Sequence, residues 1–295
     1  MMRILRRSLR VIIEAYWDFL ADDGWAIASH IALSALMALF PFLILVTSLA
    51  ASFFGSKNLA DEVATLLLEA WPSQVAGPIE SEIHNVLTRT RGDILTIGAA
   101  LSLYFASSGI ESLRIGLNRA YDMVETRHFL LLRLESIAYV LIAALALIAL
   151  SFLIVLGPLI FTTAAKYAPG LAALEWNFTI ARYSVASLVL VLALLIAHKW
   201  LPAGRRSFQD IIVGILVTLI LWLIAGFAFG RYLTEFAYAY VSYYAGLASA
   251  MIALVFLYWS ACIFVYGGEL NAAIGRLRER SAAIGGDVRG SAPDP

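Results

Sequence analysis

The polar residues best suited to bind a charged ligand gather where an apolar run ends. The stretch YFASSGIESLRIGLNRAYD carries them at steps of four, three, four and four residues: Ser107, Glu111, Arg114, Asn118 and Asp122. On a helix this spacing puts them on one face, and Glu111 can pair with Arg114. Such a stripe could hold the headgroup of an amphiphile, or it could fix a neighbouring helix.

A second carboxylate follows the last apolar run, in YGGELN, where Glu269 and Asn271 come after two glycines. Both runs are expected to end at the same membrane face. A substrate or headgroup pocket could therefore be framed by six residues: Glu111, Arg114, Asn118, Arg119, Glu269 and Asn271. The alternative is that they form ion pairs that set helix depth, because charges are costly in hydrocarbon and seek partners.

Residue combinations for metal or nucleophilic catalysis are missing from the sequence. The four histidines are far apart, and HxH, HExxH, GxxxxGK[ST] and GxSxG do not occur. The one cysteine, Cys262, lies in an apolar run and can form neither an intramolecular disulfide nor a CxxC zinc site. The sequence therefore predicts no metal, no cofactor and no enzyme.

Composition identifies the class of protein. The 295 residues are 61% hydrophobic and only 14% charged, and the mean hydropathy is +0.84. Soluble domains are about 45–50% apolar and about 25% charged, so an integral membrane protein is predicted. The net charge of zero argues against a nucleic-acid partner.

Runs without Asp, Glu, Lys or Arg predict an all-α bundle of six transmembrane helices within residues 24–275. The expected spans are 25–54, 93–113, 134–164, 180–200, 210–231 and 245–270. Residues 1–23 should form a basic amphipathic helix on the cytoplasmic membrane surface. Two short amphipathic helices are expected outside the membrane over 58–93, and a disordered cytoplasmic tail over 276–295.

The distribution of basic residues predicts the orientation. Fifteen of the 21 Lys and Arg residues fall in the terminal segments and in the loops after the second and fourth spans. By the positive-inside rule both termini should be cytoplasmic.

Prolines and glycines predict where the helices bend and pack. Pro41 should bend the first span, with His30 and Ser34 on the cytoplasmic side of the bend. His30 fits a hydrogen-bonded interhelical residue better than a proton relay. Gly157 and Pro158 should kink the third span. Small residues in the fifth span should allow close helix packing: Gly214, Gly226 and Gly230.

Four stretches in this order resemble the YihY/BrkB family of bacterial inner-membrane proteins over roughly residues 10–275: ALSALMALFPFLI, SSGIESLRIGLNRAYD, KWLPAGRRSFQDIIVGILV and YYAGLASAMIALVFLYWSACIFVYGGELN. The resemblance implies six spans, cytoplasmic termini and an inner-membrane location. It also associates the chain with envelope integrity, serum resistance and lipid export. Some members were labelled ribonuclease BN, but this sequence lacks the metal-ligand clusters that a nuclease would need.

Two functions remain open at this point. The chain could be a transporter or flippase of an anionic lipid or another amphiphile, with membrane lipids as its partners. It could instead be a non-transporting scaffold that organises envelope lipids, a second copy of itself or an envelope protein. A lateral, lipid-sized cleft lined by polar residues would favour transport, and a closed, apolar, tightly packed bundle would favour the scaffold.

Overall fold

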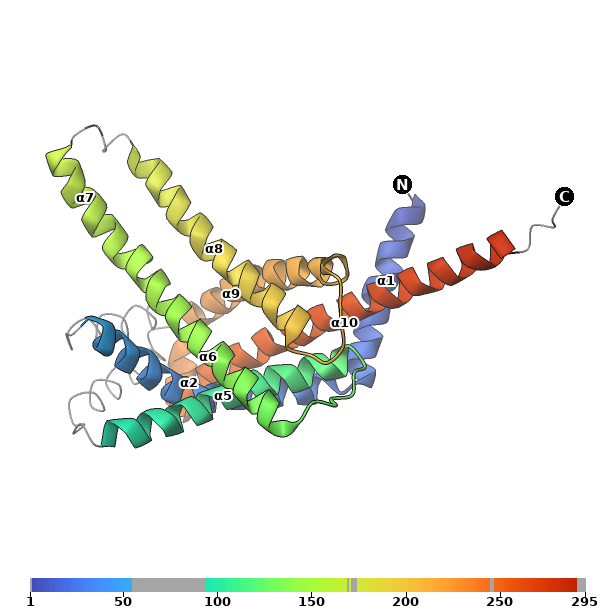
Figure 1. The fold of residues 1–295 in the computed structure, drawn as a ribbon, viewed down its shortest axis with the longest axis horizontal. Helices are drawn as coiled ribbons and strands as arrows, with labels where there is room; N and C mark the ends of the chain where they lie inside the picture. The colour runs from blue at the N-terminus through green and yellow to red at the C-terminus, as the bar shows by residue number, and fades with distance from the viewer. Residues whose placement is uncertain (1, 55–93, 169, 171–173, 245–246, 291–295) are drawn as a thin grey trace.

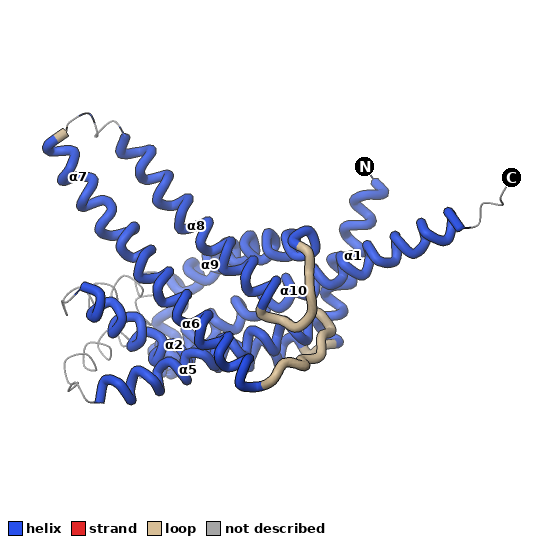
Figure 2. The backbone as a smooth tube through the Cα atoms, in the orientation of Figure 1, coloured by secondary structure: helices blue, strands red, loops and turns tan. Residues whose placement is uncertain are grey.

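The fold is described from a computed structural model that covers residues 2–54, 94–168, 170, 174–244 and 247–290. The coloured chain in Figure 2 is helical, apart from short loops. The expected external helices over 58–93 lie outside the described residues. The described chain resumes at Ile94, where the helix α5 begins. The helices are α1 Met2–Ala21, α2 Gly24–Phe54, α5 Ile94–Ala120, α6 Phe129–Ser151, η1 Phe152–Leu156, α7 Gly157–Tyr167, α8 Glu175–Trp200, α9 Phe208–Tyr244 and α10 Ala248–Gly290.

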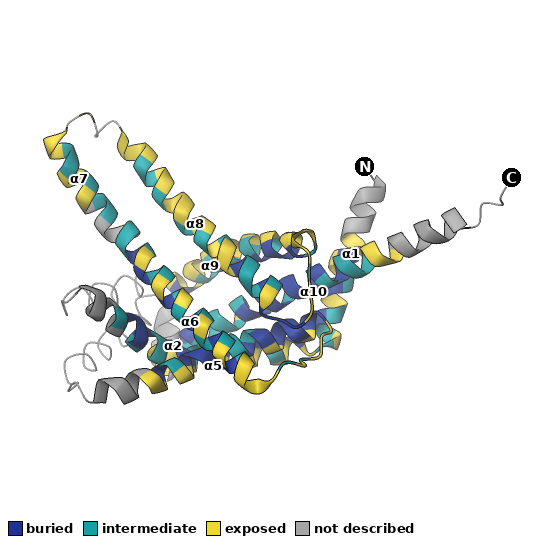
Figure 3. Ribbon diagram, in the orientation of Figure 1, coloured by how far each residue is buried: buried dark blue, intermediate teal, exposed yellow. Residues whose placement is uncertain are grey.

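The helix α10 is the centre of the bundle and packs against α9, α2, α1 and α5. The main apolar core lies around it and includes Ile31 of α2, Leu117 of α5, Ile215 of α9 and Val265 of α10. Figure 3 shows buried residues concentrated here, while much of α8 is exposed. Some apolar side chains are buried between the helices, and others are exposed on the outside of the bundle. This is expected for a membrane protein.

The helices α6 and α7 run away from the core together with α8, as Figure 1 shows. Only Leu194 and His198 of α8 are buried, both near its end. Five described helices are long and apolar enough to cross a membrane, namely those over 24–46, 129–154, 175–200, 208–236 and 248–280. The helix α5 is not among them, so a sixth span remains a prediction.

The third predicted span is divided where the kink was expected. The π-helical turn η1 directly precedes Gly157 and Pro158. Proline has no N–H to donate to the carbonyl four residues back, which is that of Ile154. The Arg182 side chain of α8 donates to this carbonyl at 3.0 Å. Pro158 therefore frees an acceptor that a neighbouring helix uses.

The C-terminal tail differs from its predicted disorder, because α10 continues to Gly290. Ion pairs explain the order in its first part. Arg276 pairs with Asp18, Arg278 with Asp210 at 2.6 Å, and Arg280 with Glu14 at 3.7 Å. The basic residues that indicated a cytoplasmic tail thus tie α10 to α1 and α9.

The first helix packs on α10 through small apolar residues. Val11 and Ala15 are buried against Leu270 and Ala273. Phe19 is buried in the main core, whereas five other large apolar residues of α1 remain largely exposed: Leu9, Ile12, Ile13, Tyr16 and Trp17. Their exposure leaves an apolar surface of the kind that an interfacial helix would present to lipid, and this interfacial role remains a prediction.

Close helix packing occurs at one of the three glycines predicted for it. A Cβ atom on Gly214 would collide with the carbonyl oxygen of Gly267 and with Asn271. Gly226 and Gly230 have open space where a Cβ would lie, so the described part of the chain does not pack closely against them as predicted. Gly116 of α5 is a further contact point, where a Cβ would lie 2.7 Å from Ile31.

The close approach of α9 and α10 at Gly214 and Gly267 predicts that substitutions at Gly214 and at Gly230 have very different effects on stability. Gly214→Val should lower the free energy of unfolding by about 1–3 kcal/mol or more, because added atoms must push two backbones apart. Gly230→Ala should be neutral or slightly stabilising, because alanine favours helix. Thermal unfolding in detergent measures both, and equal effects of the two variants would contradict the crossing.

Candidate functional site

Two arginines anchor α5 to α6 at the polar end of α5. Arg133 pairs with Glu111 at 2.6 Å, and Arg114 lies 3.6 Å from Glu135. Arg114 also donates to Ser136 Oγ at 3.0 Å. The predicted Glu111–Arg114 pair within α5 is therefore replaced by two pairs between helices. The cause is tertiary, since α6 brings its own charges to the same face.

Arg133 is held from several directions. It is 8% exposed, donates to the Tyr104 carbonyl at 3.0 Å and lies 3.7 Å from the centre of the Tyr104 ring. A buried guanidinium with a carboxylate, a carbonyl and an aromatic face is well compensated. The arginine stabilises the α5–α6 contact and is not free for a ligand.

The loop after α5 is fixed by Arg127. Its guanidinium contacts Glu125 at 2.7 Å and Glu135 at 2.9 Å, and it donates to the Leu201 carbonyl at 2.9 Å. Asn118 donates to Glu125 and accepts from the backbone N–H of Ala203 at 2.6 Å. These contacts join the loop after α5 to the loop after α8 (Figure 1).

A buried chain of hydrogen bonds continues from this loop into the core. The Gly214 N–H donates to Asn271 Oδ1 at 2.7 Å, and Asn271 Nδ2 donates to the Tyr121 hydroxyl at 3.2 Å. The Tyr121 hydroxyl oxygen lies 2.9 Å from His198 Nδ1. Because the phenol accepts from Asn271, it can donate its own proton to a neutral His198 that accepts at Nδ1.

Tyr121 is suited to remain a neutral donor. Burial raises its pKa to about 12. The Arg206 guanidinium lies 3.9 Å from the centre of its ring and donates to the Ala203 carbonyl at 2.8 Å. We name this whole set of interacting side chains the junction network: Glu111, Arg114, Asn118, Tyr121, Glu125, Arg127, Arg133, Glu135, His198, Arg206 and Asn271.

The six residues predicted to frame one pocket are divided among three environments. Arg114, Asn118, Glu111 and Asn271 belong to the junction network. Arg119 is exposed and pairs with Asp22 at 3.2 Å. Glu269 is 1% exposed. It precedes Asn271 by two residues, which is about 200° around a helix, so the two side chains leave α10 on opposite sides.

Other predicted residues do not join the network. His30 is exposed and Ser34 is half-buried on α2, which continues as helix through Pro41. Asp122 follows the end of α5 with a positive φ of 51°, so it leaves the predicted helical stripe. Among the described residues there is no group of three His, Cys, Asp or Glu side chains that could hold a metal ion.

Several members of the junction network were missed in the sequence. Arg133 and Glu135 stand at the start of the third predicted span, and Arg127 lies in a loop. A pair of opposite charges at the edge of an apolar run was the available signal. His198 and Tyr121 gave no signal, because they are 77 positions apart and meet only through the fold.

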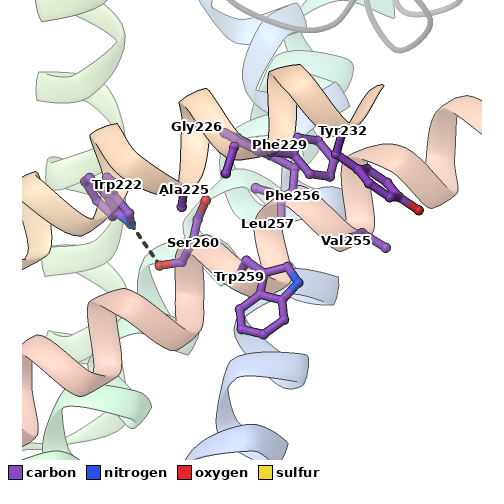
Figure 4. Close-up of a pocket in the computed structure, with 11 residues that line it drawn as sticks. Trp222, Ala225, Gly226, Phe229, Tyr232, Val255, Phe256, Leu257, Trp259 and Ser260 are labelled. Atoms are coloured by element: carbon purple, nitrogen blue, oxygen red, sulfur yellow. Dashed lines mark hydrogen bonds between the residues drawn. The ribbon is translucent and has the colours of Figure 1, made fainter. Parts of the chain in front are cut away.

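A separate apolar pocket of about 710 Å³ lies between α9 and α10. Figure 4 shows aromatic side chains of both helices around it, with Trp222 and Tyr232 at its two ends. The Trp222 ring N–H donates to the Ser260 carbonyl at 3.0 Å, so this wall presents apolar surface. Gly226 lines the pocket, which explains the open space above its Cα. The volume is in the range of small-molecule sites.

The ion pairs between α5 and α6 predict the outcome of a double-mutant cycle. Glu111→Gln and Arg133→Gln should show a coupling energy of about 1–3 kcal/mol in unfolding, because they share a partly buried ion pair. Glu111→Gln with Arg114→Gln should show a smaller coupling. Chemical denaturation in micelles measures both cycles, and the reverse order would contradict the pairing.

Glu125 predicts an acid-dependent loss of stability. Its hydrogen bonds from the Arg127 side chain hold its pKa at about 2, well below the usual range. A carboxyl with a depressed folded pKa stabilises the fold above its unfolded pKa of about 4.3, and this contribution is lost as the pH falls toward 2. Glu125→Gln should therefore cost about 1.5–3 kcal/mol at pH 7 and little at or below pH 2.

Thermal unfolding of the wild type and Glu125→Gln between pH 2 and 7 tests this expectation. Glu235→Gln is the matched control, because the ion pair that Glu235 makes among the described residues, with Arg231 at 3.8 Å, is exposed. A constant difference between wild type and Glu125→Gln over the whole pH range would show that Glu125 does not act through its charge.

Comparison with known proteins identifies the family. The family model described as "Virulence factor BrkB" matches residues 15–287. The ribonuclease-like protein YfkH of Bacillus subtilis is 26% identical over 266 residues, which cover 90% of this chain and 95% of that protein. A UPF0761 membrane protein of Coxiella burnetii is 25% identical over 92% of this chain and 95% of its own length.

A longer relative shares the same region. A UPF0761 membrane protein of Rhodospirillum centenum is 23% identical over 92% of this chain but only 58% of its own length. No solved structure matches the chain. Because the family match covers most of the chain and agrees with the resemblance found in the sequence, this is a membrane protein of the YihY/BrkB family.

Proposed function

We propose that this protein is a transporter or flippase of an anionic lipid or a similar amphiphile, acting in the bacterial inner membrane and contributing to envelope integrity. The observation that carries the proposal is the apolar pocket between α9 and α10. Both helices are long and apolar enough to cross a membrane, so lipid chains are the most abundant apolar molecules around them.

The position of the pocket along α9 fits a lipid chain. Trp222 lies twelve residues after Asp210, which is about 18 Å along a helix. The hydrocarbon core is about 30 Å thick. If Asp210 lies at the cytoplasmic boundary, the pocket extends from near the middle of the membrane toward the opposite face. An acyl or isoprenoid chain is the ligand that matches its apolar lining.

Arg231 is the cation that best suits an anionic headgroup at this pocket. It follows Ala228, a lining residue, by three positions and so lies on a similar side of α9. Its side chain is 73% exposed, and its pair with Glu235 is long, at 3.8 Å. Such exposed pairs contribute little, so Arg231 can turn to a phosphate or carboxylate. Arg114 is less suitable, because it is buried among its partners in the junction network.

The scaffold is the second candidate, and the junction network favours it. Most of its charged side chains have partners on a neighbouring helix or loop, as expected of a packed structural junction. A lipid-sized cleft with a polar lining was expected for a transporter, and a closed apolar bundle for a scaffold. The pocket has the size for a lipid chain, but its lining is apolar, so it meets only one part of the expectation for a transporter. Membrane lipids are the proposed partners in both cases, and a scaffold would add a second copy or an envelope protein. Both termini are proposed to be cytoplasmic.

Reconstitution into liposomes with a labelled anionic lipid tests transport. The wild type should accelerate movement of the lipid between leaflets, and Gly226→Leu should reduce this rate several-fold, because its side chain fills the pocket. Gly230→Leu is the matched control, one turn further along α9, where a Cβ meets nothing within 4 Å. Both variants must first show the thermal stability of the wild type.

Three outcomes separate the candidate functions. Equal lipid movement with and without protein, over several lipid classes, would exclude transport. Lipid that remains bound to the wild type but not to Gly226→Leu, without movement between leaflets, would favour the scaffold. Equal activity of wild type and Gly226→Leu would show that the lipid uses another route.

A further inference from the structure

Glu269 of α10 is a buried carboxyl group without a hydrogen-bond partner among the described residues. Its residue is 1% exposed, and neither carboxylate oxygen has a hydrogen bond within the part of the chain that the structure describes. An ionised carboxylate in such a site would lose its hydration without compensation, which costs several kcal/mol. Glu269 therefore differs from Glu111, Glu125 and Glu135, each of which contacts an arginine.

The surrounding charges leave Glu269 as a surplus acid. Four charged groups act on it: Asp18 at the end of α1, Asp22 between α1 and α2, Arg119 of α5 and Arg276 of α10. The two arginines are already engaged, because Arg276 pairs with Asp18 and Arg119 pairs with Asp22. Three carboxyl groups thus share two guanidinium groups, and the one that is buried has no ion-pair partner.

The helix packing encloses this carboxyl group. Its neighbours in α10, Gly268 and Leu270, face α5 and α1: a Cβ on Gly268 would lie 3.0 Å from Ala120, and Leu270 packs in a cluster with Val11 and Ala15.

We propose that Glu269 is a proton-binding site, occupied in the structure described here by one exchangeable proton that neutralises the carboxyl group. Loss of the proton would create a negative charge that competes with Asp18 for Arg276 and with Asp22 for Arg119. Either exchange would break an ion pair that fixes the α1–α2 corner to the bundle. Proton binding at Glu269 is thereby linked to the docking of α1, and this inference does not depend on lipid transport.

The sign of the linkage follows from the two states. In the unfolded chain a glutamic acid loses its proton near pH 4.3. If the folded protein retains that proton, stability must fall as the pH rises above this value, until the folded carboxyl also ionises. Glu269→Gln, which keeps the shape without the charge, should remove this fall.

Infrared spectroscopy of the full chain, labelled with ¹³C at the glutamate carboxyl groups, tests the site directly. The wild type should show the C=O stretch of a protonated carboxyl at pH 7, and this band should be missing from Glu269→Gln. Glu279→Gln is the matched control, because Glu279 is exposed on the same helix and its substitution should leave the band intact. A band that persists in Glu269→Gln, or is absent from the wild type, overturns the proposal.

Asp18→Asn provides a second test that does not require Glu269 to be changed. The substitution frees Arg276, which can then pair with Glu269 and favour its ionised form. The proton at Glu269 should therefore be bound at least tenfold more weakly, and the infrared band should disappear at a lower pH than in the wild type. An unchanged titration would show that Arg276 and Glu269 are not linked as proposed.

Discussion

The need to pair charge inside an apolar environment is the constraint on which this structure depends. Arginine cannot give up its charge in a protein, so each arginine that the helices bury must be met by acceptors. Arg114 and Arg133 meet theirs across the α5–α6 contact, and Arg127 meets its own across two loops. These requirements set which helices are neighbours and in which register they lie.

The paired charges act together with close backbone packing. At Gly214 and Gly267 the helices α9 and α10 approach so closely that no side chain fits between them. The same approach lets Asn271 reach the Gly214 N–H and the Tyr121 hydroxyl. In a membrane, small residues and interhelical hydrogen bonds replace much of the hydrophobic driving force. One crossing thus supports the core and the junction network together.

The two halves of α9 have different surroundings. Its first half lies in the packed core, with Ile211, Gly214 and Thr218 buried. Its second half lines an apolar pocket with α10. The packed half holds the bundle together, and the other half offers an apolar space, which is the feature that the proposed lipid function would use. Glu269 adds a titratable group at the packed end.

The sequence by itself determined the membrane class, the helical composition and the family, because apolar runs and ordered motifs carry that information locally. It also pointed to the polar residues of α5 and to Gly157 and Pro158 in the third span, directly before which the π-helical turn η1 lies. It could not determine partners: Glu111 meets Arg133 instead of Arg114, and Glu269 and Asn271 point to different sides of α10. Only the tertiary structure decided these contacts, the helical order of residues 276–290 and the pocket beside Gly226. The physical reason is that helical periodicity fixes which residues share a face, whereas packing between distant helices decides what that face meets.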